Sequence, residues 1–291
     1  MKLRKNPLLK IIKNRKAVSE ILAAIMMIFM FIAAIGVVWA WLFPAYQRFQ
    51  TTNTINSVNS YMLRVDETFY DIYGEGVGST KAVRMDPSYG TFIYESGRNV
   101  SVRFSDAGTT FSDTYTLTDL GRFSYTLNNR RGVMINEGDH KYLKGPSTQK
   151  VFFVNGSADG VVYQGLTNLT LLRPAEKSMK MELEYRVRIY TWFDQTNNVL
   201  SITVNIIQID IKATDFSFFS YNTLKINYNS SRTVYSTTTN VATDFYVDGS
   251  IDSQSFIPIE RPLLFNKPSS VVNYDVNIEI VVNQFLLWVG G

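Results

Sequence analysis

The sequence contains no cysteine and only one histidine among its 291 residues. The lack of cysteine excludes disulfides, thiol catalysis and thiolate metal sites, so any folded domain must be stabilised by its core alone. The single histidine, His140, closes the polar stretch 136–140. We expect it to be a solvated turn residue, because histidine chemistry usually needs oriented partners.

The chain also lacks a glycine loop that could cradle phosphate, the residue order of a catalytic triad and any metal-ligand motif. Acidic residues gather at Asp66 and Glu67, and at Asp248 and Asp252, but without the loop spacing of a calcium site. We therefore expect these carboxylates on a solvated surface. The sequence predicts a protein that is not an enzyme and that binds no cofactor and no metal ion.

An excess of positive charge is lacking once the residues before Ala17 are set aside. The net charge of +4 depends on seven basic residues that precede Ala17, namely Lys2, Arg4, Lys5, Lys10, Lys13, Arg15 and Lys16. Without them, 22 basic residues face 25 acidic ones, which leaves a net charge of about −3. The high pI therefore belongs to the N-terminal segment, and we predict no nucleic-acid partner.

Residues Ile21 to Phe43 carry no charge at all. As a helix, this run would measure about 34 Å, enough to cross a hydrocarbon core of about 30 Å. Trp39 and Trp41 lie near one end, and the basic residues precede the other, which predicts a cytoplasmic N-terminus and an external C-terminal part. A cleaved secretory signal would have a shorter apolar run and a small-residue cleavage site. An uncleaved membrane anchor is the simpler alternative.

The junction before the apolar run consists of Arg15, Lys16, Ala17 and Val18, followed by Ser19 and Glu20. It resembles the class III signal peptide of archaeal type IV pilins and archaellins. The resemblance covers only this N-terminal segment, and it implies that a prepilin peptidase cuts after Ala17 on the cytoplasmic side. The bacterial pilin pattern, with glutamate as the fifth mature residue, is not met, because Glu20 is third and Leu22 is fifth.

Such a helix has two uses. In the membrane it holds the subunit, and after extraction its apolar surface can be buried against like or related pilin subunits. The small residues that would allow close helix approach are Ala23, Ala24, Ala33, Ala34 and Gly36, although such residues are common in any spanning helix. We expect Glu20 to pair with the new amino group of Val18 on a neighbouring subunit, because a lone carboxylate is costly in hydrocarbon.

The next segment, 44–76, reads as an amphipathic neck helix and linker. Pro44 is expected to kink or end the apolar helix, and the Thr- and Asn-rich stretch 51–56 to break it locally. Spacings of three and four then define one apolar stripe that packs on its own domain. Its members are Ile55, Val58, Met62, Val65, Phe69 and Ile72. Gly74, Gly76 and Gly78 stop the helix.

After residue 80 the helical period gives way to alternation. The clearest pair of strands is 181–193 and 199–211, predicted as a long hairpin with one buried and one wet face. On the wet face the sequence places Glu182, Glu184, Arg186 and Arg188. Weaker candidates are 90–94, 100–104, 115–127, 151–154, 169–172, 224–228, 233–236, 245–247, 271–282 and 283–289.

Together these patterns predict an α+β chain, with a long N-terminal transmembrane helix followed by a mainly antiparallel, β-sandwich-like domain. The expected division is a cytoplasmic leader at 1–17, the transmembrane or filament-core helix at 18–43, the neck at 44–76 and an extracellular β domain at 77–291. Residues 173–176 are a candidate boundary within that domain. The apolar stretch 285–289 is expected to be a core or edge strand, with donation to a neighbouring subunit as the alternative.

Four sequons provide candidate N-glycosylation sites at Asn99, Asn155, Asn168 and Asn229, all external in the predicted topology. The predicted function is that of a pilin-like structural subunit of an archaeal type IV filament or surface appendage, concerned with assembly and adhesion. The alternative is a membrane-anchored surface protein that never polymerises, such as an adhesin, a contact to the S-layer or a ligand-binding module.

Overall fold

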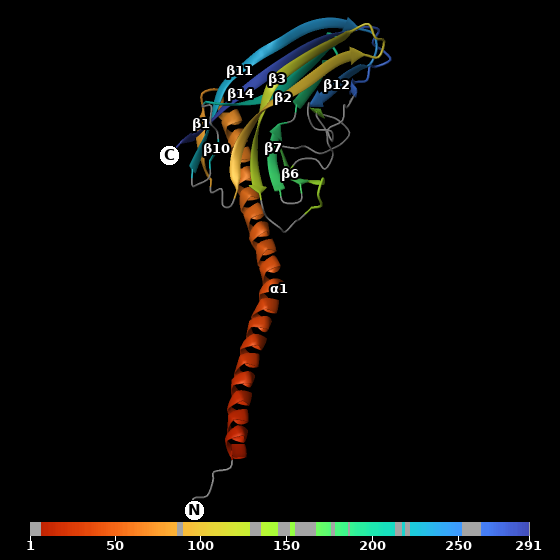
Figure 1. Ribbon diagram of the computed structural model, residues 1–291. Coiled ribbons are helices and arrows are strands. Elements are labelled where there is room, and N and C mark those ends of the chain that lie inside the picture. Colours follow the sequence, from red (N-terminus) through yellow and green to blue (C-terminus); the bar gives the residue numbers. More distant parts are fainter. Residues whose placement is uncertain are drawn as a thin grey trace, which may run out of the picture. The chain divides into compact units, whose positions relative to one another are not determined.

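The computed structural model describes residues 7–85, 90–128, 135–144, 152–154, 167–175, 178–185, 187–212, 217–218, 222–251 and 263–290 (Figure 1). One long helix, α1 (Pro7–Glu75), precedes all the strands. The strands are β1 (Thr80–Met85), β2 (Thr91–Asp106), β3 (Ser112–Asn128), β4 (His140–Lys144), β5 (Phe152–Val154), β6 (Thr167–Ala175), β7 (Ser178–Tyr185), β8 (Val187–Asp194), β9 (Val199–Ile211), β10 (Ser217–Phe218), β11 (Asn222–Val241), β12 (Phe245–Ile251), β13 (Leu263–Phe265) and β14 (Tyr274–Gly290).

The helix α1 continues through both places where the sequence predicts an interruption. Pro44 lies inside it, and so does the whole stretch 51–56. The helix therefore does not end at Pro44, and the kink expected there stays a prediction. In the polar stretch the Thr51 hydroxyl donates to the Gln47 carbonyl at 2.9 Å, so this side chain bonds within the helix. The local break predicted at 51–56 is therefore wrong.

The end of α1 is where the glycines predict it. The helix ends at Glu75, and Gly76 and Gly78 both adopt a φ of +95°, which favours glycine. The chain divides into two compact units between Thr52 and Asn53, within α1. The first unit includes the apolar run, and the second holds the end of α1 and the described strands.

In the second unit the predicted apolar stripe lies in the core. All six of its residues are at most 4% exposed, and Phe69 packs edge-on against Tyr185 and Phe285 with ring centroids 5.7 and 5.1 Å apart. The stripe shares this core with buried residues of β1, β11 and β14 and of β2, β3 and β7. The prediction that the stripe packs on its own domain is confirmed.

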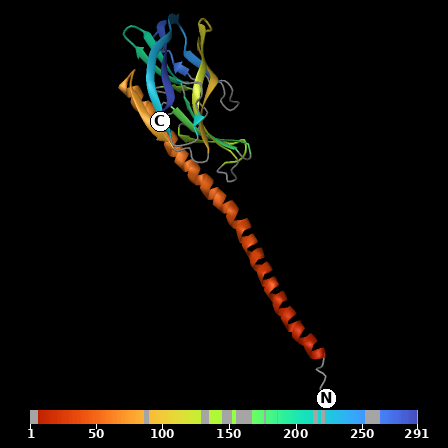
Figure 2. The ribbon, with the colours of Figure 1, turned by 60° about the vertical axis from the view of Figure 1, so that its left-hand side comes forward.

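The strands form two sheets (Figures 1 and 2). One has six strands in the order β1-β11-β14-β9-β8-β5, and the other has eight, ordered β13-β12-β2-β3-β7-β6-β4 with β10 beside β2. The pairs β9–β14 and β5–β8 are parallel, and the other described pairs are antiparallel. A second core cluster contains buried residues of both sheets. An α+β chain with a mainly antiparallel β part is thus confirmed, and the sandwich stays a prediction.

The predicted hairpin 181–211 is only half right. β8 and β9 pair from Arg188–Asn205 to Asp194–Val199, but β7 belongs to the other sheet, so the chain changes sheets between β7 and β8.

The candidate boundary at 173–176 is also wrong, because residues up to Ala175 lie in β6, beside β7. The C-terminal stretch forms the end of β14, a central strand whose Phe285 and Leu287 are fully buried, as expected of a core strand.

Candidate functional site

The predicted processing junction lies within α1. The backbone of Arg15, Lys16, Ala17 and Val18 is helical, and their side chains lie outside the described residues. Glu20 follows on the same helix with an exposed side chain. The structure therefore places the junction and Glu20 next to one another on one continuous helix, directly before the apolar run.

The apolar run itself is uncovered. Every side chain from Ile21 to Phe43 is exposed, and Trp41 reaches 86%. Among the described residues, α1 is the one helix that is long and apolar enough to cross a membrane, with a mean hydropathy of 2.9 in its most apolar window. So much exposed apolar surface is compatible with a membrane anchor or a signal sequence, and it is unusual for a protein surface in water.

The four sequons differ in their surroundings. Asn229 is exposed and its amide donates to Gln284 at 3.0 Å, whereas Asn99 is half-buried in β2. Asn168 in β6 is fully buried, so the folded domain does not present it to a glycosylating enzyme. Asn155 lies outside the described residues. Of the described sequons, Asn229 is the accessible one.

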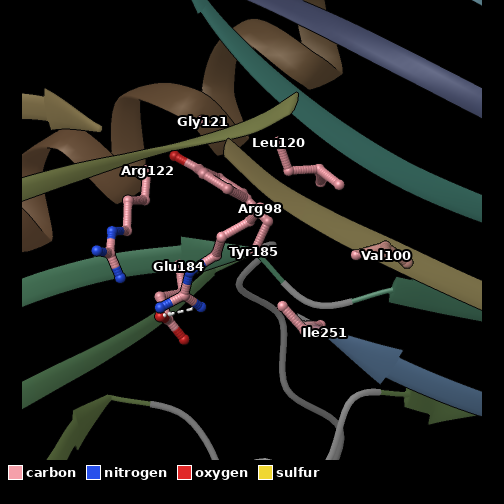
Figure 3. A pocket seen from close by; sticks show the side chains of 8 residues that line it. All are labelled: Arg98, Val100, Leu120, Gly121, Arg122, Glu184, Tyr185 and Ile251. Atoms are coloured by element: carbon pink, nitrogen blue, oxygen red, sulfur yellow. Dashed lines mark ion pairs between the residues drawn. The ribbon is translucent and has the colours of Figure 1, made fainter. Parts of the chain in front are cut away.

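A buried cluster of charges on the eight-stranded sheet is the feature that the sequence reading missed (Figure 3). Glu182 and Glu184 of β7, expected on a wet face, are only 2% and 3% exposed. Arg98 of β2 binds both, with its Nη1 2.5 Å from Glu184 Oε1 and its Nη2 3.6 Å from Glu182 Oε2. The two acidic residues are buried because basic residues of neighbouring strands neutralise them.

Three further residues complete this ion cluster. Arg122 of β3 lies 3.0 Å from Glu182 and also pairs with Glu95 of β2. Lys180 of β7 lies 2.6 Å from Glu182 and 2.7 Å from Glu95. The cluster therefore holds three cations and three carboxylates, and its formal charges cancel.

A bulge in β2 brings Arg98 to this face. The register with β3 shifts on both sides of Arg98, and Gly97 adopts a φ of +91°. A glycine at positive φ is the usual residue of such a bulge, which re-aims the following side chain. The bulge thus allows Glu95 and Arg98 of one strand to reach the same carboxylates on β7.

The surrounding cations fix the charge state of Glu182. Burial by itself would raise its pKa, but Arg122, Lys180 and Arg98 together outweigh burial and hold the pKa below its ordinary value of 4.5. A carboxylate held in this way stays ionised near neutral pH and does not shuttle protons there. The cluster is suited to fixing the alignment of β2, β3 and β7.

A small pocket that is partly open to solvent lies beside the ion cluster. Arg98, Arg122 and Glu184 line one side, and Val100, Leu120 and Ile251 line the apolar side (Figure 3). Figure 3 shows the Arg98 guanidinium directed at Glu184. The charged side of the pocket is thus engaged within the protein.

Asp66 also departs from the sequence reading. It was expected on a solvated surface, but it is 1% exposed, and it pairs with Lys144 of β4. Burial raises the pKa of Asp66, even though Lys144 opposes this effect. Burial and the nearby Asp66 charge also raise the pKa of Tyr185 well above its usual value. The neighbouring Glu67 is exposed as expected.

His140 is half-buried as the first residue of β4, with its ring edge-on to Tyr142 at 5.4 Å, and it is not a solvated turn residue as predicted. Within the described parts of the chain, no three His, Asp or Glu residues lie close enough to hold a metal ion.

Comparison of this chain with models of known protein families, with curated proteins and with solved structures gives no match.

One signal in the sequence could have indicated the ion cluster. Lys180, Glu182 and Glu184 alternate along one strand, so their side chains share a face. A wet face needs no matching charges, but a buried one requires basic partners on both neighbouring strands. Arg122 lies inside a predicted strand and Arg98 just before another, in positions that could supply them.

Proposed function

We propose that this chain is a pilin-like, non-catalytic structural subunit of an archaeal type IV filament or surface appendage. The observation that carries the proposal is the uncharged run from Ile21 to Phe43, whose side chains are all exposed on α1. A surface of this kind needs either lipid or another apolar helix around it. The same helix can thus hold the subunit in the membrane and later bury itself in a filament core.

The residues before this run support a defined maturation step. By the resemblance to class III signal peptides, a prepilin peptidase removes residues 1–17 and leaves Val18 as the first residue. The freed amino group of Val18 would then lie close to Glu20. In a bundle of such helices, that amino group on one subunit can neutralise Glu20 of the next.

The second compact unit, which holds the described strands and is called the β unit from here on, supports a structural role rather than a catalytic one. The charges of its ion cluster neutralise one another, and the cations keep Glu182 ionised. In the proposed topology this unit lies outside the cell, where it could contact an S-layer or another surface ligand. The proposed partners of the helix are the membrane, the prepilin peptidase and like or related pilin subunits.

The first experiment is mass spectrometry of the intact protein after extraction from membranes of the native cell. The proposal expects a mature chain that begins at Val18. The matched control is Lys16→Glu, which disrupts the basic residue before the cut and should leave the chain full length. Recovery of the unaltered protein with Met1, or cut beyond Phe43, would overturn the pilin assignment.

The second experiment separates a filament subunit from a stationary surface protein. Shearing should release the wild-type chain from cells in a sedimentable fraction. Glu20→Ala and Glu20→Gln chains should remain processed and membrane-bound but enter that fraction poorly. A mature chain that begins at Val18 but stays entirely with the membrane after shearing would instead favour the surface protein that does not polymerise.

A further inference from the structure

The strand β11 has a long side that no other strand covers. β1 pairs with β11 only over residues 222–227, while β14 pairs with its other side up to Val241. Among the described strands, none pairs with the outer side of β11 beyond residue 228. Alternate backbone N–H and C=O groups there point away from β14, as in any edge strand.

The last seven residues of this edge, Tyr235–Val241, form a regular segment. The register with β14 shifts before Ser230 and again before Tyr235, and then runs without interruption to Val241 opposite Tyr274. The segment reads YSTTTNV and contains no charge, glycine or proline. Natural edges are usually protected by charges, prolines or bulges, and none of these lies within the segment. Its composition instead suits close pairing of strands.

The segment is also held in a fixed conformation. The hydroxyl of Tyr235 donates to Asp113, and its ring lies 6.1 Å from that of Tyr115. On the exposed face, Thr238 donates to Asn277 at 2.8 Å, and Asn240 donates to Asp275 at 2.7 Å. A strand ordered in advance loses little entropy when it binds.

We infer that Tyr235–Val241 is an interaction edge that pairs, antiparallel, with the same segment of a second copy of this chain. A twofold axis at Thr238 would place Tyr235 opposite Val241 and Thr237 opposite Thr239. Aromatic pairs with β-branched residues and pairs of threonines are favourable across strands. The segment is therefore complementary to itself, as a twofold interface requires.

The charges that flank the segment favour the same arrangement. The first charges outside it are Arg232 on one side and Asp244 on the other. Antiparallel self-pairing brings each of them towards the end of the partner that carries the opposite charge, whereas parallel pairing would bring like charges together. The electrostatics thus select the antiparallel orientation.

Three other open edges, on β8, β4 and β13, are poorer partners than β11. Beyond its contact with β5, β8 offers only residues 190–194, which end in Asp194. The edge strand β4 carries Lys141 and Lys144, and β13 is only three residues long. A seven-residue uncharged edge is matched in length by a second β11 and by none of these three.

The absence of cysteine allows a direct test on the full-length chain in detergent, using single cysteines. At the twofold axis, Thr238→Cys should oxidise to a disulfide-linked dimer, because paired strands hold opposite Cα atoms within disulfide range. The control is Asn277→Cys, which is also exposed and removes the same hydrogen bond, but lies one strand further from the axis. We expect about tenfold more dimer for Thr238→Cys, because pairing raises the effective thiol concentration.

Register is tested by mixing two variants. Ser236→Cys and Asn240→Cys chains should each form little disulfide alone but should crosslink to one another, because their positions are opposite only in the inferred register. Thr238→Lys should abolish this crosslinking when it is added to both chains, since it places like charges directly opposite. Thermal unfolding of each variant checks that the fold is retained.

The inference is overturned if Thr238→Cys gives no more dimer than Asn277→Cys while the mixed pair crosslinks no better than either variant alone. Crosslinking of the mixed pair supports it even if Thr238→Cys is poorly folded, because neither mixed variant alters Thr238. The inference does not depend on the proposed filament. An uncut chain that never assembles should still pair through β11.

Discussion

At the scale of single residues, two buried carboxylates respond to burial in opposite ways. Glu182 of β7 has three cations around it and a pKa below its ordinary value. Asp66 of α1 pairs with one cation among the described residues, Lys144, and its pKa is raised. Desolvation disfavours the charged form of both, so the number of nearby cations decides the outcome. The two residues should therefore make opposite contributions to the pH dependence of stability.

For Glu182, we predict that Glu182→Gln lowers the free energy of unfolding at pH 7 by about 3 kcal/mol, because it leaves buried Arg98 with fewer counter-charges. Since the folded pKa is depressed, the stability from Glu182 is fully present above pH 4.5 and is lost as the pH falls through the lowered pKa. The destabilisation should therefore shrink in acid. Denaturant unfolding at several pH values measures it, with the exposed Glu67→Gln as the control, and an equal loss in both variants would contradict the prediction.

For Asp66 the sign is reversed. A raised folded pKa means that the ionised form costs stability, and this cost appears as the pH rises above the ordinary value of 3.8. We predict that the stability of Asp66→Asn relative to wild type improves as the pH rises from 3 towards 7. Lys144, which is partly exposed, can turn to solvent in this variant. A relative stability that falls over the same range would show that the Lys144 pair outweighs burial.

At the scale of elements, β3 approaches β9 of the other sheet at Gly121. A Cβ atom added at Gly121 would lie 2.5 Å from the carbonyl oxygen of Ile209 and would also collide with the Tyr94 ring. Tyr94 itself donates to the same carbonyl at 3.2 Å, and burial raises its pKa to about 12. Gly121 is therefore required by close packing between two strands.

We predict that Gly121→Ala lowers the free energy of unfolding by about 1–3 kcal/mol, because the added methyl group overpacks this contact. The control is Gly74→Ala near the end of α1, where an added Cβ meets no atom within 4 Å. That variant should be neutral or slightly stabilising, because alanine favours helix. Thermal unfolding measures both, and equal melting temperatures for the two variants would contradict the packing argument.

The elements that sequence reading found are those specified by local periodicity. Spacings of three and four predicted the buried stripe around Phe69. Alternation located most of the longer strands, although it split β2, β11 and β14 into two candidates each. The short strands β1, β4, β10 and β13 were missed, because so few residues show no clear alternation. The change of sheets between β7 and β8 was missed, because a continuous alternation carries no signal of which sheet a strand joins. The buried side of Glu182 was missed for the same reason, since its partners come from β2 and β3.

The uninterrupted α1 was missed for a different reason. A proline inside a helix can kink it without ending it, and nothing in the local sequence around Pro44 shows that the 69-residue helix continues. The exposed run from Ile21 to Phe43, in contrast, depends on composition alone and was found directly. The apolar run could thus be predicted from composition. The ion cluster could not, because it forms only where β2, β3 and β7 meet.

At the scale of the whole molecule, charge is divided along the chain. Seven cations precede Ala17, and the remainder carries a net charge of about −3. Basic residues are retained on the cytoplasmic side of a membrane, so this division predicts that the β unit lies outside. The orientation can be tested without disturbing α1, because the chain has no cysteine of its own.

We predict that a membrane-impermeant maleimide labels Asn277→Cys, which is exposed on β14, to the same extent in intact and in lysed cells. The matched control, Val282→Cys on the same strand, is fully buried and should react only after denaturation, which confirms that the reagent reports on a folded domain. If Asn277→Cys reacts only after lysis, the β unit is cytoplasmic. Both an adhesive role and a peptidase cut on the opposite side of the membrane from the β unit require an external β unit. A cytoplasmic β unit would therefore rule out both.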